Sequence, residues 1–170
     1  MKGTFLATAI FIGMAISSTQ AMAVGAYVEL PLQLSLKNCS QDCSPSPEGF
    51  IAGAMIDNLG IGLGYYIANQ NDAIPFQQFR WSTLDVTYLL PIPVVNVSVG
   101  AGMVFVAIDN KVAGTYSGGG YQMILKAGYQ VIPFLDIHGS YYSTSATVDF
   151  GSQSTDVSSS LIALGVTLSF

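Results

Sequence analysis

With 170 residues the chain is long enough for one domain, but 51% of its residues are hydrophobic and only 9% are charged, whereas soluble domains carry about 25% charged residues. Much of the surface is therefore not expected to face water. After the N-terminus, however, no apolar run approaches the roughly 18 residues of a membrane-spanning helix. The net charge of −5 comes from few groups, and without a basic stripe no nucleic-acid partner is expected.

Residues 1–23 have the composition of a secretory signal peptide. Lys2 supplies the positive charge, and the apolar segment from Phe5 to Ile16 is too short to span a bilayer. The sequence AMA, which ends at Ala23, is a small-x-small cleavage site. We therefore expect export through the Sec pathway, removal of residues 1–23 and one folded domain over residues 24–170; an N-terminal anchor helix is the alternative.

Cys39 and Cys43 are the only cysteines of the chain. Disulfides persist outside the cytoplasm, so an exported chain is expected to join this pair within a short loop. No metal site is expected, because the single histidine lies far away in the sequence. No cofactor is expected either.

Beyond residue 23, apolar and polar residues alternate between turn signals, which is the period of a strand whose two faces meet different media. In the first such stretch every even position from Val24 to Leu36 is apolar, over more residues than the usual strand of about 5–6. The alternation predicts about eight strands, over residues 24–37, 50–56, 61–67, 83–90, 95–105, 121–130, 135–142 and 161–170.

The predicted connections alternate in length. DNLG, PIP and the turn at Pro133 are short, whereas NQNDAIP, DNKVAGTYSGGG and the Ser/Thr-rich segment over residues 143–160 are longer and polar. Short periplasmic turns with longer outer loops are typical of bacterial outer-membrane barrels, which have an even number of strands.

A sheet that spans hydrocarbon must close, because no edge can stay unpaired there. An eight-stranded barrel has room inside only for side chains, so the polar and glycine-rich set must point inward. That set includes Gly53, Gly62, Gly64, Gly100, Gly102, Gly128 and Gly165. The prediction is an all-β fold, a single closed antiparallel up-and-down transmembrane β-barrel of eight strands. A soluble lipocalin-like barrel or sandwich is the alternative, but its outer face would need more charge than the polar set carries.

Aromatic residues of the apolar set lie near the predicted strand ends. They form one group at the short-turn side, Tyr88, Tyr129 and Phe170, and another at the long-loop side, Phe50, Tyr65, Phe105 and Tyr121. Two such girdles are expected at the two interfaces of a membrane.

The segments VSVGAGMVF and LKAGYQVIPFLDIHGSYY are similar to the glycine-plus-aromatic strands of the small OmpA/OmpX-type barrels. The last strand, with Gly165, Leu168 and the terminal Phe170, resembles the C-terminal signal of Gram-negative outer-membrane proteins. The resemblance implies a place in the Gram-negative outer membrane. It also implies contact with outer-membrane lipid and lipopolysaccharide, and recognition by the barrel-assembly machinery.

Charged residues of the polar set are expected to form a network in the lumen. It comprises Glu29, Arg80, Asp85, Lys126, Asp136 and His138, with Arg80 higher on its strand than the others. Buried charges need partners, so we expect Lys126 to pair with Glu29 or Asp85. In the alternative, water solvates each group separately.

Asp136, His138 and Ser140 share one strand face and suggest an acid, a base and a nucleophile. The HGS sequence matches the His-x-Ser pair of the lipid A deacylases, but Tyr141 stands where that family has Asn. These residues are also expected to face the lumen and not lipid, and residues two apart on a strand are poorly placed to bond. A polar lumen ladder is therefore the preferred interpretation.

Three functions follow. The preferred one is a structural or surface-interaction barrel with a lumen filled by side chains, which is not an enzyme. The alternatives are a passive channel for small or apolar molecules, as in the OmpW-like barrels that the chain also resembles, and a lipid A-modifying hydrolase.

Overall fold

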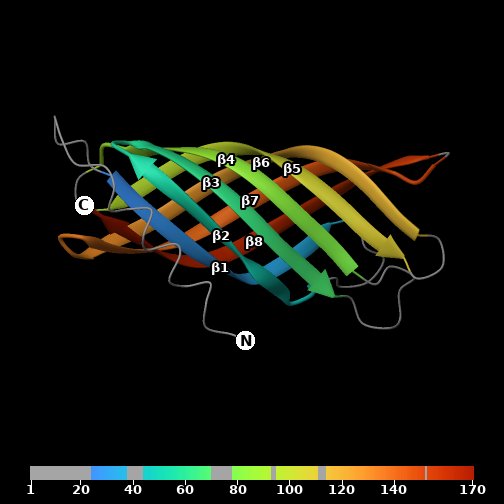
Figure 1. Cartoon of the computed structure of the whole chain (residues 1–170), viewed down its shortest axis with the longest axis horizontal. Coiled ribbons are helices and arrows are strands. Elements are labelled where there is room, and N and C mark those ends of the chain that lie inside the picture. Colours follow the sequence, from blue (N-terminus) through green and yellow to red (C-terminus); the bar gives the residue numbers. More distant parts are fainter. Residues whose placement is uncertain (1–23, 38–43, 70–77, 93–94, 111–113, 152) are drawn as a thin grey trace.

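The computed structural model describes residues 24–37, 44–69, 78–92, 95–110, 114–151 and 153–170. Each strand pairs antiparallel with the next in the chain, and the last closes on the first, so the predicted eight-stranded up-and-down barrel is confirmed (Figure 1). The strands are β1 (Val24–Lys37), β2 (Pro47–Ile56), β3 (Leu59–Asn69), β4 (Gln78–Leu90), β5 (Asn96–Asn110), β6 (Gly114–Ile132), β7 (Leu135–Asp149) and β8 (Ser154–Ser169). Residues 1–23, Cys39 and Cys43 lie outside the described residues, and so do their predicted cleavage and disulfide.

On all eight strands the apolar set points outward, except at Leu34 and Leu36 in the upper half of β1. Leu30 is 59% exposed and Leu164 is 50% exposed, whereas their neighbours Glu29 and Ala163 are buried in the lumen. This is the reverse of a water-soluble barrel, whose apolar residues fill its interior. Within the described residues, no helix is long and apolar enough to cross a membrane.

The predicted aromatic residues also point outward, and all seven are exposed. Phe50 pairs with Tyr65, which pairs with Ser82, and Ser82 pairs with Phe105, so one row of the sheet carries three of the four rings predicted for the long-loop side. At the other end the backbone of Phe170 exchanges two hydrogen bonds with Val24, of 2.7 and 3.3 Å. The terminal residue is therefore held against the start of β1.

The upper half of β1 departs from the predicted alternation. A β-bulge between Pro31 and Gln33 shifts the register against β8, and an extra residue moves all later side chains to the opposite face. Leu34 is therefore fully buried and Leu36 packs against the core, although both were predicted to face outward. The proline explains the site of the bulge, because it has no N–H to donate to the ladder.

Two segments predicted as loops are instead strand. The β5–β6 ladder runs to Asn110–Gly114 and the β7–β8 ladder to Asp149–Ser154. The β7–β8 hairpin projects beyond the ends of β3 and β4 (Figure 1). Its residues are polar on one face and small on the other, so the apolar/polar alternation that marks the lower strands is missing. Ala146, Val148 and the partly buried Val157 are the apolar residues that point inward here.

Candidate functional site

A cluster of charged side chains fills the lumen toward the short-turn end, and Glu29 of β1 is at its centre. The Glu29 side chain is fully buried. Its Oε1 atom accepts hydrogen bonds from Lys126 Nζ of β6 and, at 3.1 Å, faces His138 Nε2 of β7. Its Oε2 atom accepts a 2.6 Å hydrogen bond from the Tyr142 hydroxyl. Three donors from two strands thus compensate the desolvation of one carboxylate.

His138 lies between two carboxylates. Its Nδ1 atom is 3.3 Å from Asp136 Oδ1 and 3.4 Å from the Thr167 hydroxyl, on the opposite side of the ring from Glu29. Asp136 is fixed in turn by a 2.7 Å hydrogen bond from Asn96 Nδ2. A ring protonated on both nitrogens can donate to both carboxylates at once.

Lys126 has an aromatic neighbour in addition to Glu29. Its Nζ atom lies 3.8 Å from the centre of the Tyr27 ring, within the range of a cation–π contact. The Tyr27 ring needs the glycines opposite it, because a Cβ atom at Gly62 would lie 2.1 Å from the Tyr27 hydroxyl. Lys126 therefore contacts Glu29, the first of the two partners expected from the sequence.

Asp85 forms a second, adjacent layer. Its carboxylate accepts hydrogen bonds from Gln122 Nε2 and, at 3.1 Å, from the Thr83 hydroxyl. The Thr144 hydroxyl lies 3.4 Å from Gln122 Oε1 and extends this network to β7. Neutral donors thus hold Asp85, while Lys126 contacts Glu29.

An apolar and aromatic layer closes the lumen on the long-loop side of these charges. Trp81 stacks between Tyr66 and Phe79, with ring centres 5.3 and 5.6 Å apart, and is fully buried. Buried aliphatic residues surround these rings: Leu34, Ile51, Val104, Val106, Ile108, Val148 and Leu161. We expected small hydrophilic residues throughout the lumen, and that expectation is wrong for this half. The sequence did indicate that these rings point inward, because Phe79 and Trp81 occupy odd positions of β4, like the inward Thr83 and Asp85.

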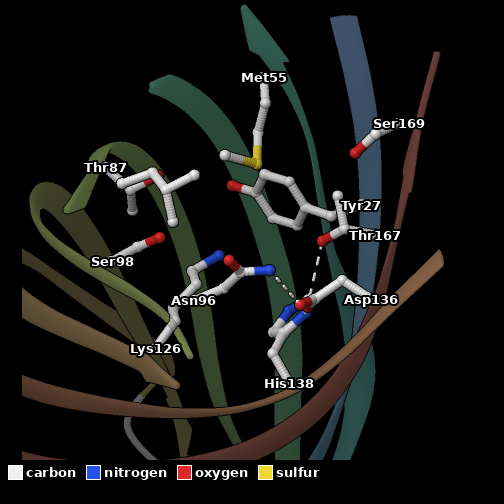
Figure 2. Close-up of a pocket in the computed structure, with 11 residues that line it drawn as sticks. Tyr27, Met55, Thr87, Asn96, Ser98, Lys126, Asp136, His138, Thr167 and Ser169 are labelled. Carbon is white, nitrogen blue, oxygen red and sulfur yellow. Dashed lines mark hydrogen bonds and ion pairs between the residues drawn. The ribbon is translucent and has the colours of Figure 1, made fainter. Parts of the chain in front are cut away.

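A pocket of about 80 Å³ lies between the charged cluster and the short-turn end of the barrel. In Figure 2 the side chains of Tyr27, Asn96, Asp136 and His138 converge on it. Such a volume holds several water molecules and no large ligand. Within the described residues, no group of three or more His, Cys, Asp or Glu side chains could hold a metal ion.

Arg80 does not join the lumen cluster, which corrects the expectation from the sequence. It lies on the outer face of β4, opposite in phase to Trp81, and its Nη2 atom lies 2.7 and 2.8 Å from the two carboxylate oxygens of Asp109 on β5. The even position of Arg80, against the odd positions of Thr83 and Asp85, was the available signal.

Ser140 is buried in the lumen, and its Oγ atom has no hydrogen-bond partner within the described residues. The two nitrogens of His138 face Glu29 and Asp136 instead. The three residues of the hydrolase interpretation therefore share a face, but the serine has no base in contact.

Gly165 of β8 lies against the cluster. A Cβ atom at this position would lie 2.5 Å from Glu29 Cγ and 2.5 Å from His138 Nε2. The sequence predicted that Gly165 points inward and belongs to the assembly signal. In the folded barrel its missing side chain leaves the space that Glu29 and His138 occupy.

We predict that Lys126→Met lowers the unfolding free energy by about 3–5 kcal/mol, because it leaves a buried carboxylate without its cation. Adding Glu29→Gln should restore most of this loss. Thermal unfolding in detergent micelles, followed by gel mobility or circular dichroism, measures both. Lys37→Met, which removes an exposed lysine of β1, is the matched control. Equal melting temperatures for Lys126→Met and wild type would contradict the pairing.

Gly165→Ala should destabilise the refolded barrel by about 1–3 kcal/mol, because the methyl group overlaps Glu29 and His138. Gly139→Ala on β7 is the control, since a Cβ atom there meets no atom within 4 Å. Refolding purified protein into detergent separates this packing effect from any effect on assembly in cells. A Gly165→Ala barrel as stable as Gly139→Ala would show that the cluster can give way.

The sequence matches no protein-family model and no curated protein. Among solved structures, Neisserial surface protein A (NspA) matches with a TM-score of 0.69 at 16% identity, over 91% of this chain and 100% of NspA. Ail, the attachment invasion locus protein of Yersinia pestis, matches with a TM-score of 0.60 at 13% identity, over 89% of this chain and 100% of Ail. At such identities the likeness concerns the fold alone. The chain therefore has the fold of the small eight-stranded outer-membrane barrels, as its resemblance to the OmpA/OmpX-type proteins implied.

Proposed function

We propose that this chain is an integral protein of the Gram-negative outer membrane whose lumen is sealed and which acts as a structural or surface-interaction element. The outward apolar set on all eight strands supports the membrane location. A signal peptide over residues 1–23 and the C-terminal signal would bring the chain to the Sec pathway and the barrel-assembly machinery.

One observation carries the sealed lumen: two different layers obstruct it in series. The charged layer is centred on Glu29 and the aromatic layer on Trp81, and both side chains have 0% exposure. A solute would have to break ion pairs and then displace stacked rings. This arrangement favours the structural or interaction role over a passive channel.

The long hairpins support a role at the surface. On the outward face of β7 and β8, Ser143 pairs with Ser160, Ser145 with Ser158 and Thr147 with Asp156. Short hydrogen bonds hold the upper part of this hairpin, from Thr147 to Asp156 at 2.8 Å and from Ser154 to Asp149. The result is a polar sheet surface that extends the barrel and is available to a partner in the aqueous phase.

The hydrolase alternative lacks two requirements. A lipid-modifying nucleophile must reach lipid, and it needs a base within hydrogen-bond distance. Ser140 is buried inside the barrel and its hydroxyl contacts neither His138 nor another acceptor within the described residues.

Purified protein inserted into planar bilayers should give no stable conductance steps, because both layers of the lumen stay closed. A general porin reconstituted by the same procedure serves as the positive control for insertion. Trp81→Ala alone should also remain silent, since the Glu29 layer is intact. Reproducible unitary openings of the wild-type protein would contradict the sealed barrel and favour the channel.

A further inference from the structure

A shallow groove of about 460 Å³ crosses the outer wall of the barrel over β4, β5 and β6. The sheet register explains its shape. Tyr65, Ser82, Phe105 and Gly119 form one cross-strand row, and Arg80, Ala107 and Ser117 form the next. Tyr65 and Phe105 thus flank Ser82, with the Arg80 guanidinium in the next row of the same strand, and the small residues of β6 lie beyond Phe105.

The groove lies where the outer face changes from apolar to polar. One row toward the short turns, Leu63, Leu84, Met103 and Tyr121 are in register. Toward the loops, the rows end in polar residues, Asn69, Gln78, Asp109 and Thr115. In a membrane, such a boundary corresponds to the level between acyl chains and headgroups.

Asp109 uses only part of the hydrogen-bonding capacity of the Arg80 guanidinium. Asp109 contacts its Nη2 atom only, and its Nε atom is buried without a hydrogen-bond partner within the described residues. A guanidinium carries five N–H donors in a planar fork that suits phosphate oxygens. A buried donor without an acceptor is costly, so a further acceptor would be favourable here.

We propose that this groove binds one phosphorylated lipid of the surrounding leaflet, with an acyl chain between Tyr65 and Phe105 and the phosphate on Arg80. The proposal rests on the membrane location inferred above. The small residues of the floor leave space for the chain, and the aromatic rings line it. Asp109 orients the guanidinium from one side and, as an anion, sets a limit on how closely the phosphate can approach Nη2.

The test uses full-length barrel refolded in neutral detergent and titrated with phosphatidic acid, a phosphate monoester lipid. Native mass spectrometry counts the lipid retained after release from the micelle. Wild-type protein should retain phosphatidic acid in preference to phosphatidylcholine of the same chains. Arg80→Gln should weaken retention by about tenfold, as expected for the loss of one charge-assisted contact.

Ser82→Leu provides an independent variant, because Ser82 lies between Tyr65 and Phe105 in the cross-strand row and the leucine fills the floor there while leaving the Arg80–Asp109 pair intact. The fold should tolerate it, since Ser82 is exposed on the outer face of β4. It should weaken retention as Arg80→Gln does. Gly139→Leu places a leucine on the outer face of β7, away from the groove, and Lys37→Gln removes an exposed cation of β1; both should retain lipid like wild type.

Equal retention by all four variants, or equal retention of phosphatidylcholine and phosphatidic acid, would overturn the proposal. The sealed lumen is tested separately, because conductance in planar bilayers would contradict it whether or not the groove binds lipid. The membrane location fails separately too, if the protein refolds in buffer without detergent.

Discussion

The backbone of this protein must satisfy its hydrogen bonds without water wherever hydrocarbon surrounds it, and a closed sheet is the strand arrangement that does so. Closure with eight strands then fixes the width of the interior, which holds side chains and little else. Inward residues of strands that are not neighbours in the sheet consequently contact one another. Glu29 of β1 is compensated by Lys126 of β6 and by His138 and Tyr142 of β7, which only a narrow barrel brings within reach.

The narrow interior is filled by two kinds of chemistry in succession. Near the short turns the carboxylates of Glu29 and Asp136 share His138, and Lys126 contacts both Glu29 and the Tyr27 ring. Nearer the loops, Trp81 and its stacked neighbours exclude water. The glycines of the wall belong to the same arrangement, because Gly62 and Gly165 leave the space that Tyr27, Glu29 and His138 occupy. The side chains that fill the lumen thus pack directly against glycines of the barrel wall.

Periodicity alone predicts the strand number, the closure and the outward face, because a membrane imposes a different medium on each side of every strand. Counting positions along the strands also predicted that Lys126 pairs with Glu29 or Asp85, and in the structure it pairs with Glu29. The bulge after Pro31 was not predictable, since one extra residue leaves the local pattern intact while reversing the faces of Leu34 and Leu36. Strands that continue into water lose the apolar face, so the ends of β5 to β8 looked like loops. For the outward Arg80 and the inward Trp81 the sequence did carry the signal, in their phase on β4.

The ladder between β1 and β2 stops at Glu29–Ile51, one residue short of Phe50, whereas β1 continues against β8 as far as Lys37–Ser158. The β1–β8 ladder that closes the barrel thus extends over nearly the whole of β1. The shortest ladder of the barrel is the one between β1 and β2. That ladder therefore ends beside the Phe50 row, on the long-loop side of the barrel. Local opening of the sheet should therefore start between β1 and β2 at the Glu29–Ile51 end of their ladder, where the ion pair of Glu29 with Lys126 still anchors β1 to the lumen cluster.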